Sequence, residues 1–201
     1  MTPAAPRRAD ARRNRDRLLA AAETALNAHG AGASLDDIAK AAGVGNATLY
    51  RHFPTRAALI EAVYDQRIAA LCALAAELPR TREPGRALHE WLRALVVHIT
   101  DSRVLAEALM AARDDPGGAQ PPQIAAWHLA IHDAAAPLLS AARSAGTVRP
   151  DLEYAELMAL TAAVARAADP ARAGRFLDIL IEGITPRPAA GHMPQREHRR
   201  P

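Results

Sequence analysis

Residues 34–56 constrain this chain more than any other stretch, because two short apolar helical patterns flank a glycine there. Ser34 is a good N-cap for the first helix, and Gly43 suits the left-handed conformation that follows many helices. Leu49 and Phe53 lie four residues apart, so they share the buried face of the second helix. The pattern predicts a helix-turn-helix, whose second helix is the candidate reader of DNA.

The side chains that point away from this buried face are small or polar, which suits contact with DNA. Asn46 can hydrogen-bond to a base edge, and the small Ala47 permits close approach. Tyr, Thr, His and Arg side chains suit phosphate oxygens. An ordinary surface helix would expose the same positions. The residues predicted to contact DNA are Arg12, Arg13, Ser34, Gly45, Asn46, Ala47, Thr48, Tyr50, Arg51, His52 and Arg56.

The segment VGNATLYRHFPTRAALIEAVY, residues 44–64, resembles the recognition-helix signature of TetR-type transcriptional repressors. The shared features are a Gly-Val turn, Thr-Leu-Tyr, His-Phe, and a basic residue before a long helix. The close resemblance covers residues 12–65, and the rest of the chain is similar in helix number and length. Gly45-Asn46-Ala47 stands where many members have Ser-x-Gly, so base contacts do not transfer. Arg56 replaces the commoner Lys and should still hold a phosphate.

The resemblance implies a ligand-responsive, bacterial repressor that binds a palindromic double-stranded DNA operator as a homodimer. A palindromic site requires a two-fold protein. Near the C-terminus one apolar stripe is broader than a single neighbouring helix needs, although packing within one chain would also use it. The predicted dimer interface comprises Phe176, Leu177, Leu180, Ile181 and Ile184.

Half of the residues are apolar but only 3% are aromatic, and strand-like runs of Val, Ile and Thr are absent, so we expect an all-α fold of about nine helices. A disordered arm (1–9) precedes the helix-turn-helix domain (10–56). The helical ligand-binding and dimerisation domain (57–184) begins with a long connecting helix that Pro79 should end. Thr100-Asp101-Ser102 should divide a helix over 84–99 from one over 102–113. A disordered tail (185–201) follows.

Positive charge lies at the two ends of the chain. Residues 1–56 carry a net charge of +4, residues 57–184 carry −4, and residues 185–201 carry +3. This asymmetry favours nucleic-acid contact by the N-terminal part. No signal peptide or membrane-spanning run is evident, and the single cysteine excludes an internal disulfide, so we expect a cytoplasmic protein.

Two tryptophans and two histidines at helical spacing suggest a ligand cavity, which the resemblance also implies. The alternative for each residue is an ordinary structural role in core packing. The candidate set is Trp91, Leu95, His98, Met110, Trp127, His128, Ile131 and Met158. With indoles and no central carboxylate, the set predicts a small, mainly apolar or aromatic effector that is neutral or weakly acidic.

Other functions are less well supported by the sequence. His128 and His132 have chelating spacing, but no third ligand lies nearby in sequence, so we expect no metal and no cofactor. No serine lies in a nucleophile elbow, and no phosphate-binding glycine loop is present, so we expect no enzymatic activity. The alternatives are a helical protein-interaction module that does not read DNA and a helical enzyme that uses histidines.

Overall fold

The computed structural model describes residues 5–111, 122–167 and 170–185, and every regular element in these ranges is helical. The all-α prediction is confirmed. No helix in the described ranges is long and apolar enough to cross a membrane. The elements are α1 (Ala5–His29), the 3₁₀ turn η1 (Gly30–Gly32), α2 (Leu35–Ala41), α3 (Asn46–His52), α4 (Arg56–Thr81), α5 (Pro84–Ala111), α6 (Pro122–Ser144), α7 (Tyr154–Ala167) and α8 (Pro170–Ile184).

The turn between α2 and α3 forms as the glycine pattern predicts. Gly43 has φ +66°, a conformation in which other residues are strained. Its N–H donates to the Lys40 carbonyl and the Val44 N–H donates to the Ala39 carbonyl, both at 3.0 Å. These are the two hydrogen bonds of a Schellman motif, and they satisfy the last carbonyls of α2. At the other end of α2, the Ser34 hydroxyl accepts the N–H of Asp37 at 3.2 Å.

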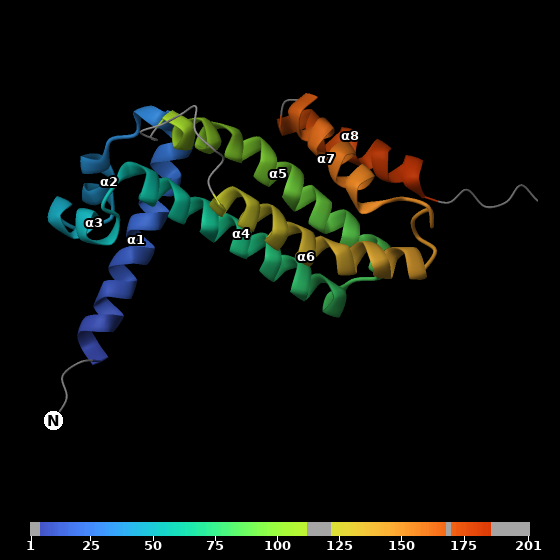
Figure 1. Ribbon diagram of the computed structural model, residues 1–201, viewed down its shortest axis with the longest axis horizontal. Helices are drawn as coiled ribbons and strands as arrows, with labels where there is room; N and C mark the ends of the chain where they lie inside the picture. The colour runs from blue at the N-terminus through green and yellow to red at the C-terminus, as the bar shows by residue number, and fades with distance from the viewer. Residues whose placement is uncertain (1–4, 112–121, 168–169, 186–201) are drawn as a thin grey trace, which may run out of the picture.

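The long helix α4 joins the N-terminal unit, defined as α1–α3, to the rest of the chain (Figure 1). It starts at Thr55, whose hydroxyl accepts the Ala58 N–H at 3.0 Å. It packs on α1 near its start and on α5 and α6 further along. Helix α5 lies between α4 and α6 on one side and α7 and α8 on the other (Figure 1). The fully buried Trp91 fixes α5 to α4, because its indole N–H donates to the Leu71 carbonyl at 3.0 Å.

The structure corrects the predicted break at residues 100–102, because these residues lie inside the continuous helix α5. The Thr100 hydroxyl donates to the Val96 carbonyl one turn earlier, at 2.9 Å. The Ser102 hydroxyl is buried and lies 3.3 Å from His98 Nδ1, also one turn earlier. Both hydroxyls therefore bond back along the same helix instead of capping a new one. The described residues form eight α-helices in place of the nine predicted.

Two predicted helix ends were also wrong. Helix α4 continues past Pro79 to Thr81, because a proline removes only one backbone donor and the Arg82 N–H still closes the last turn on the Leu78 carbonyl at 2.9 Å. Helix α1 begins at Ala5, so residues 5–9 of the predicted arm are helical. Pro6 is tolerated there because first-turn N–H groups have no partner within a helix. The rest of the predicted arm and the tail from residue 186 lie outside the described residues.

Candidate functional site

The second helix of the helix-turn-helix presents one buried and one exposed face. Leu49 and Phe53 are 1% and 3% exposed, which confirms the predicted inward pair. On the opposite face Tyr50 is 48% exposed. Gly45, Asn46, Ala47 and Arg51 are also exposed, whereas Thr48, His52 and Arg56 are half-buried. With α2, this helix forms one end of the elongated molecule (Figure 1), so the predicted reader face is accessible.

A hydrogen bond between α2 and α3 fixes the side chain predicted to read bases. The Asn46 amide nitrogen donates to Asp36 Oδ1 at 2.7 Å. A carboxylate accepts hydrogen bonds and repels a carbonyl oxygen, so the NH₂ group must face Asp36. The Asn46 carbonyl oxygen and one N–H therefore remain available for DNA. The role of Asp36 could not be predicted from the sequence, because nothing in a linear pattern links two residues across a turn.

The other predicted DNA contacts differ in how their side chains are held. Ser34 accepts a backbone N–H, which leaves its own O–H free to donate to a phosphate. The buried Nε2 atom of His52 has no hydrogen-bond partner among the described residues, so a phosphate contact would require the other ring nitrogen. Arg12 and Arg13 are exposed on α1, and Arg13 pairs with Asp10 one turn earlier.

Basic residues on α1 also approach the helix-turn-helix itself. The Arg15 guanidinium lies 5.5 Å from the centre of the Phe53 ring, which is cation–π geometry. A Cβ added to Gly43 would lie 3.5 Å from Arg17 Nη1. Positive side chains of α1 therefore lie beside the helix-turn-helix, and the basic segment that contains Arg15 and Arg17 stays a predicted contact to phosphates or the minor groove.

The predicted ligand residues do not all gather at one place. Trp91 and Leu95 are fully buried in the core, and the indole N–H of Trp91 is already bonded to the backbone of α4. His128 is exposed, because it lies one residue beyond Trp127, which faces the core. Met158 on α7 is half-buried against the core. The Met110 side chain lies outside the described residues.

His98 and Trp127 do lie close together, because both rings pack against Tyr64. The rings of Tyr64 and Trp127 stack with centroids 4.3 Å apart, and His98 packs edge-on against Tyr64 at 5.4 Å. The Trp127 indole donates to Asp65 Oδ1 at 2.6 Å. This aromatic cluster joins α4, α5 and α6. Tyr64 and Asp65 were missed because their helical spacing looks like that of ordinary core and surface residues.

Burial controls the protonation of the aromatic cluster. Desolvation, with a smaller contribution from the Arg67 charge, lowers the pKa of His98 from 6.5 to about 4. The imidazole is therefore neutral at pH 7. Burial also raises the pKa of the Tyr64 phenol, and a hydrogen bond from Ser102 and the Arg67 charge partly offset this effect. At neutral pH both groups are uncharged donors or acceptors of hydrogen bonds.

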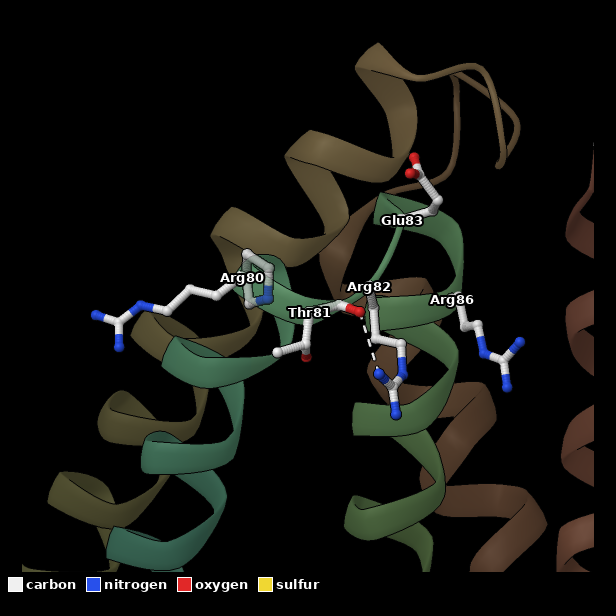
Figure 2. A pocket seen from close by; sticks show the side chains of 6 residues that line it. Arg80, Thr81, Arg82, Glu83 and Arg86 are labelled. Carbon is white, nitrogen blue, oxygen red and sulfur yellow. Dashed lines mark hydrogen bonds between the residues drawn. The ribbon is translucent and has the colours of Figure 1, made fainter.

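A pocket of about 740 Å³ lies at the turn between α4 and α5, far along α4 from the reader helix. Figure 2 shows that Arg80 and Arg86 point in opposite directions from it. Arg82 and Arg86 pair with Glu90, and Arg80 pairs with Glu77. Each of the three arginines already has a carboxylate partner, and Arg82 and Arg86 share the single carboxylate of Glu90. Within the described residues, no group of three or more His, Cys, Asp or Glu side chains could hold a metal ion.

The predicted dimer stripe on α8 has two faces. Leu177 and Ile184 are buried within the chain, whereas Leu180 and Ile181 are half-buried against the core. Phe176 is 40% exposed, and Ile179, which was not predicted, is 54% exposed. On α7, which packs against α8, Leu160 is also exposed.

The fold and the exposed reader face define a helix-turn-helix protein with a helical C-terminal part. The profile of bacterial regulatory proteins of the TetR family matches residues 18–63, and that of the SbtR-like transcriptional regulator C-terminal domain matches residues 83–186. The chain belongs to the TetR family of transcriptional regulators. Members of this family are generally DNA-binding proteins without enzymatic activity. No curated protein matches the chain in sequence.

Solved structures of TetR regulators resemble the chain along most of its length. A regulator from Streptomyces coelicolor is 36% identical, with a TM-score of 0.72 and coverage of 86% of this chain and 98% of that one. One from Mycobacterium vanbaalenii is 34% identical, with a TM-score of 0.70 and coverage of 90% and 99%. LfrR from Mycobacterium smegmatis, solved with proflavine, is 22% identical with a TM-score of 0.57 and coverage of 88% and 99%, and shows the shared fold alone.

Proposed function

We propose that this protein is a ligand-responsive repressor, which binds a palindromic DNA operator in the cytoplasm as a homodimer and is released by a small, mainly apolar effector. The observation that carries the proposal is the reader helix: Leu49 and Phe53 are buried while Asn46, Tyr50 and Arg51 are exposed. This arrangement offers one side chain suited to base edges and two suited to phosphates.

We assign the proposed roles to different groups of helices. Residues 10–56 bind DNA, and residues 57–184 bind the effector and form the dimer. The exposed apolar residues of α7 and α8 support a two-fold contact there, since large exposed apolar side chains are candidates for burial in an interface. The inward residues Leu177 and Ile184 hold α8 on its own chain, so we restrict the proposed interface to apolar residues that are exposed (Leu160, Phe176 and Ile179) or half-buried (Leu180 and Ile181).

The aromatic cluster of Tyr64, His98 and Trp127 is the proposed place where an effector acts. Tyr64 lies on α4, which also packs against the N-terminal unit, so a shift of Tyr64 would be transmitted along a single helix. Its neutral partners His98 and Trp127 favour an apolar or weakly acidic compound over a polycation. Such a compound releases DNA only if it binds the released state more tightly than the DNA-bound state.

DNA-binding variants test the proposal. Tyr50→Ala and Arg56→Ala should weaken binding to every DNA sequence, because both remove contacts to phosphates. Arg56→Ala should also reduce the slope of log K against log salt by about one. Arg80→Ala is the matched control, since it removes an exposed arginine paired within α4. Unchanged affinity in both test variants would overturn the proposed reader helix.

Effector binding is tested by tryptophan fluorescence during titration with a library of hydrophobic compounds. A true effector should change the emission of Trp127, which stacks on Tyr64, and should release the operator by linkage. A Trp127→Phe variant identifies the responding indole because Trp91 is then the remaining tryptophan. Compounds that change Trp127 emission but leave DNA affinity unaltered would contradict a regulatory role for the aromatic cluster.

A further inference from the structure

A half-buried arginine joins three helices where the N-terminal unit meets the rest of the chain. The Arg67 side chain on α4 is 11% exposed. Its Nε donates to Glu23 Oε1 at 2.9 Å and its Nη2 donates to Asn27 Oδ1 at 2.7 Å, and both acceptors lie on α1. Its Nη1 donates to Ser102 Oγ on α5 at 3.4 Å. One guanidinium therefore contacts α1 and α5 at the same time.

This contact is sensitive to the orientation of α1. A buried guanidinium is costly to desolvate unless its donors have partners. Its N–H groups also diverge at fixed angles from a rigid plane, so acceptors on two helices must lie in particular directions. A rotation of α1 that withdrew Glu23 and Asn27 would leave the charged and mostly covered Arg67 side chain poorly paired. The bonded state therefore favours one orientation of α1 relative to α4 and α5.

The same contact lies on the route between the reader helix and the proposed dimer face. Helix α1 packs on α2 and so carries the helix-turn-helix with it. Helix α5, which carries Ser102, packs directly on α7 and α8. In a two-fold dimer, the orientation of α1 relative to α5 sets the separation of the two reader helices. Half-sites lie about one helical turn, ~34 Å, apart, so a small rotation places the second helix out of register.

We propose that Arg67 is a positioning residue that sets the half-site spacing the dimer accepts, an inference that rests on the proposed function. Arg67 lies on α4, outside the helix-turn-helix, and its guanidinium is held by α1 and α5, so it makes no contribution to base recognition. Its loss should therefore change which spacing is bound and leave the preferred half-site sequence as it is. A role limited to general stability would lower affinity at all spacings equally.

The experiment uses the full-length dimer and the half-site that the wild-type protein enriches from random DNA. Two inverted copies of that half-site are separated by spacers that lengthen one base pair at a time. Arg67→Ala removes the contact from the α4 side, and the double variant Glu23→Ala/Asn27→Ala removes both of its acceptors on α1. Arg67→Lys keeps the charge but loses the fork. Arg80→Ala, which removes an exposed α4 arginine that pairs with Glu77 on its own helix, is the control.

Wild type and Arg80→Ala should prefer one spacing sharply. In Arg67→Ala and in the double variant, the affinity ratio between the best and the adjacent spacing should fall by about tenfold, equivalent to losing one charge-assisted hydrogen bond. Arg67→Lys should recover part of this ratio. If Arg67→Ala does not fold, the double variant decides, because its changes lie on the more accessible α1 side.

The two possible failures are distinguishable. If wild-type protein enriches no paired half-sites, the proposed function is wrong. If wild type shows a sharp spacing preference and the folded variants keep it, the proposed function stands and the role of Arg67 is overturned.

Discussion

The smallest feature that sets base preference on the proposed reader face is the orientation of one amide. The Asn46 NH₂ group faces Asp36 at 2.7 Å, which leaves the carbonyl oxygen and a single N–H for DNA. One acceptor beside one donor matches the N6 and N7 positions of adenine, whereas guanine offers two acceptors.

We expect Asn46→Ala to lose discrimination at one base pair of each half-site, by about 1–3 kcal/mol. Asp36→Ala should relax the same position, because the freed amide can rotate and donate to guanine. Competition binding to operators substituted at every position measures both effects. Asp37→Ala, on the same turn of α2, is the control. Loss of discrimination at different positions in the Asn46 and Asp36 variants would contradict this coupling.

A second effect at residue scale is the pH dependence that His98 confers on stability. The unfolded state gains a proton below a pKa of about 6.5, whereas the folded state gains it only near 4. The free energy of unfolding should therefore fall as pH decreases from 6.5 to 4, by up to about 3 kcal/mol from this group. Above pH 6.5 the contribution of His98 is constant.

Urea unfolding of wild type and His98→Gln, at fixed protein concentration, measures this contribution. The variant should lose less stability between pH 7 and pH 4.5. Carboxylates with lowered pKa values, such as Asp178 beside Arg93, titrate in both proteins and cancel in the comparison. Equal losses in the two proteins would show that His98 is not the titrating group.

At the scale of elements, α8 combines attachment to its own chain with an outward apolar face. Phe176→Glu and Ile179→Glu place a charge on that outward face, at 40% and 54% exposed positions, without disturbing the buried Leu177. Both variants should sediment as monomers with unchanged helical content. Leu129→Glu is the control, because Leu129 is an apolar residue on α6 that is 61% exposed. Dimers that persist in both α8 variants would exclude this face as the interface.

Sequence patterns predicted the local architecture where one physical effect dominates. Gly43, Leu49 and Phe53 lie where turn geometry and helical spacing required, and the long α4 follows from an unbroken apolar period. The break predicted at residues 100–102 is absent, because side-chain oxygens can accept or donate hydrogen bonds within their own helix as readily as they cap another. The prediction that α4 ends at Pro79 was wrong for a related reason, since the last turn of α4 closes without the N–H that proline lacks.

At the scale of the whole molecule, the contacts between distant helices could not be predicted from local periodicity. The pairing of Asn46 with Asp36 and the contacts of Arg67 join residues on separate helices. Trp91 and Trp127 looked equivalent in the sequence, yet the first is fixed in the core and the second stacks on Tyr64. Periodicity identifies which face of a helix is buried, but the partner on that face depends on how the helices cross.

The most direct test of the account is selection of binding sites from random double-stranded DNA by the purified full-length protein. Two reader helices in a two-fold dimer should enrich an inverted repeat whose half-site centres lie about one helical turn apart. Tyr50→Ala should fail to enrich it under the same salt conditions. Enrichment of no inverted repeat, or the same enrichment by Tyr50→Ala, would contradict DNA reading through α3 by a dimer.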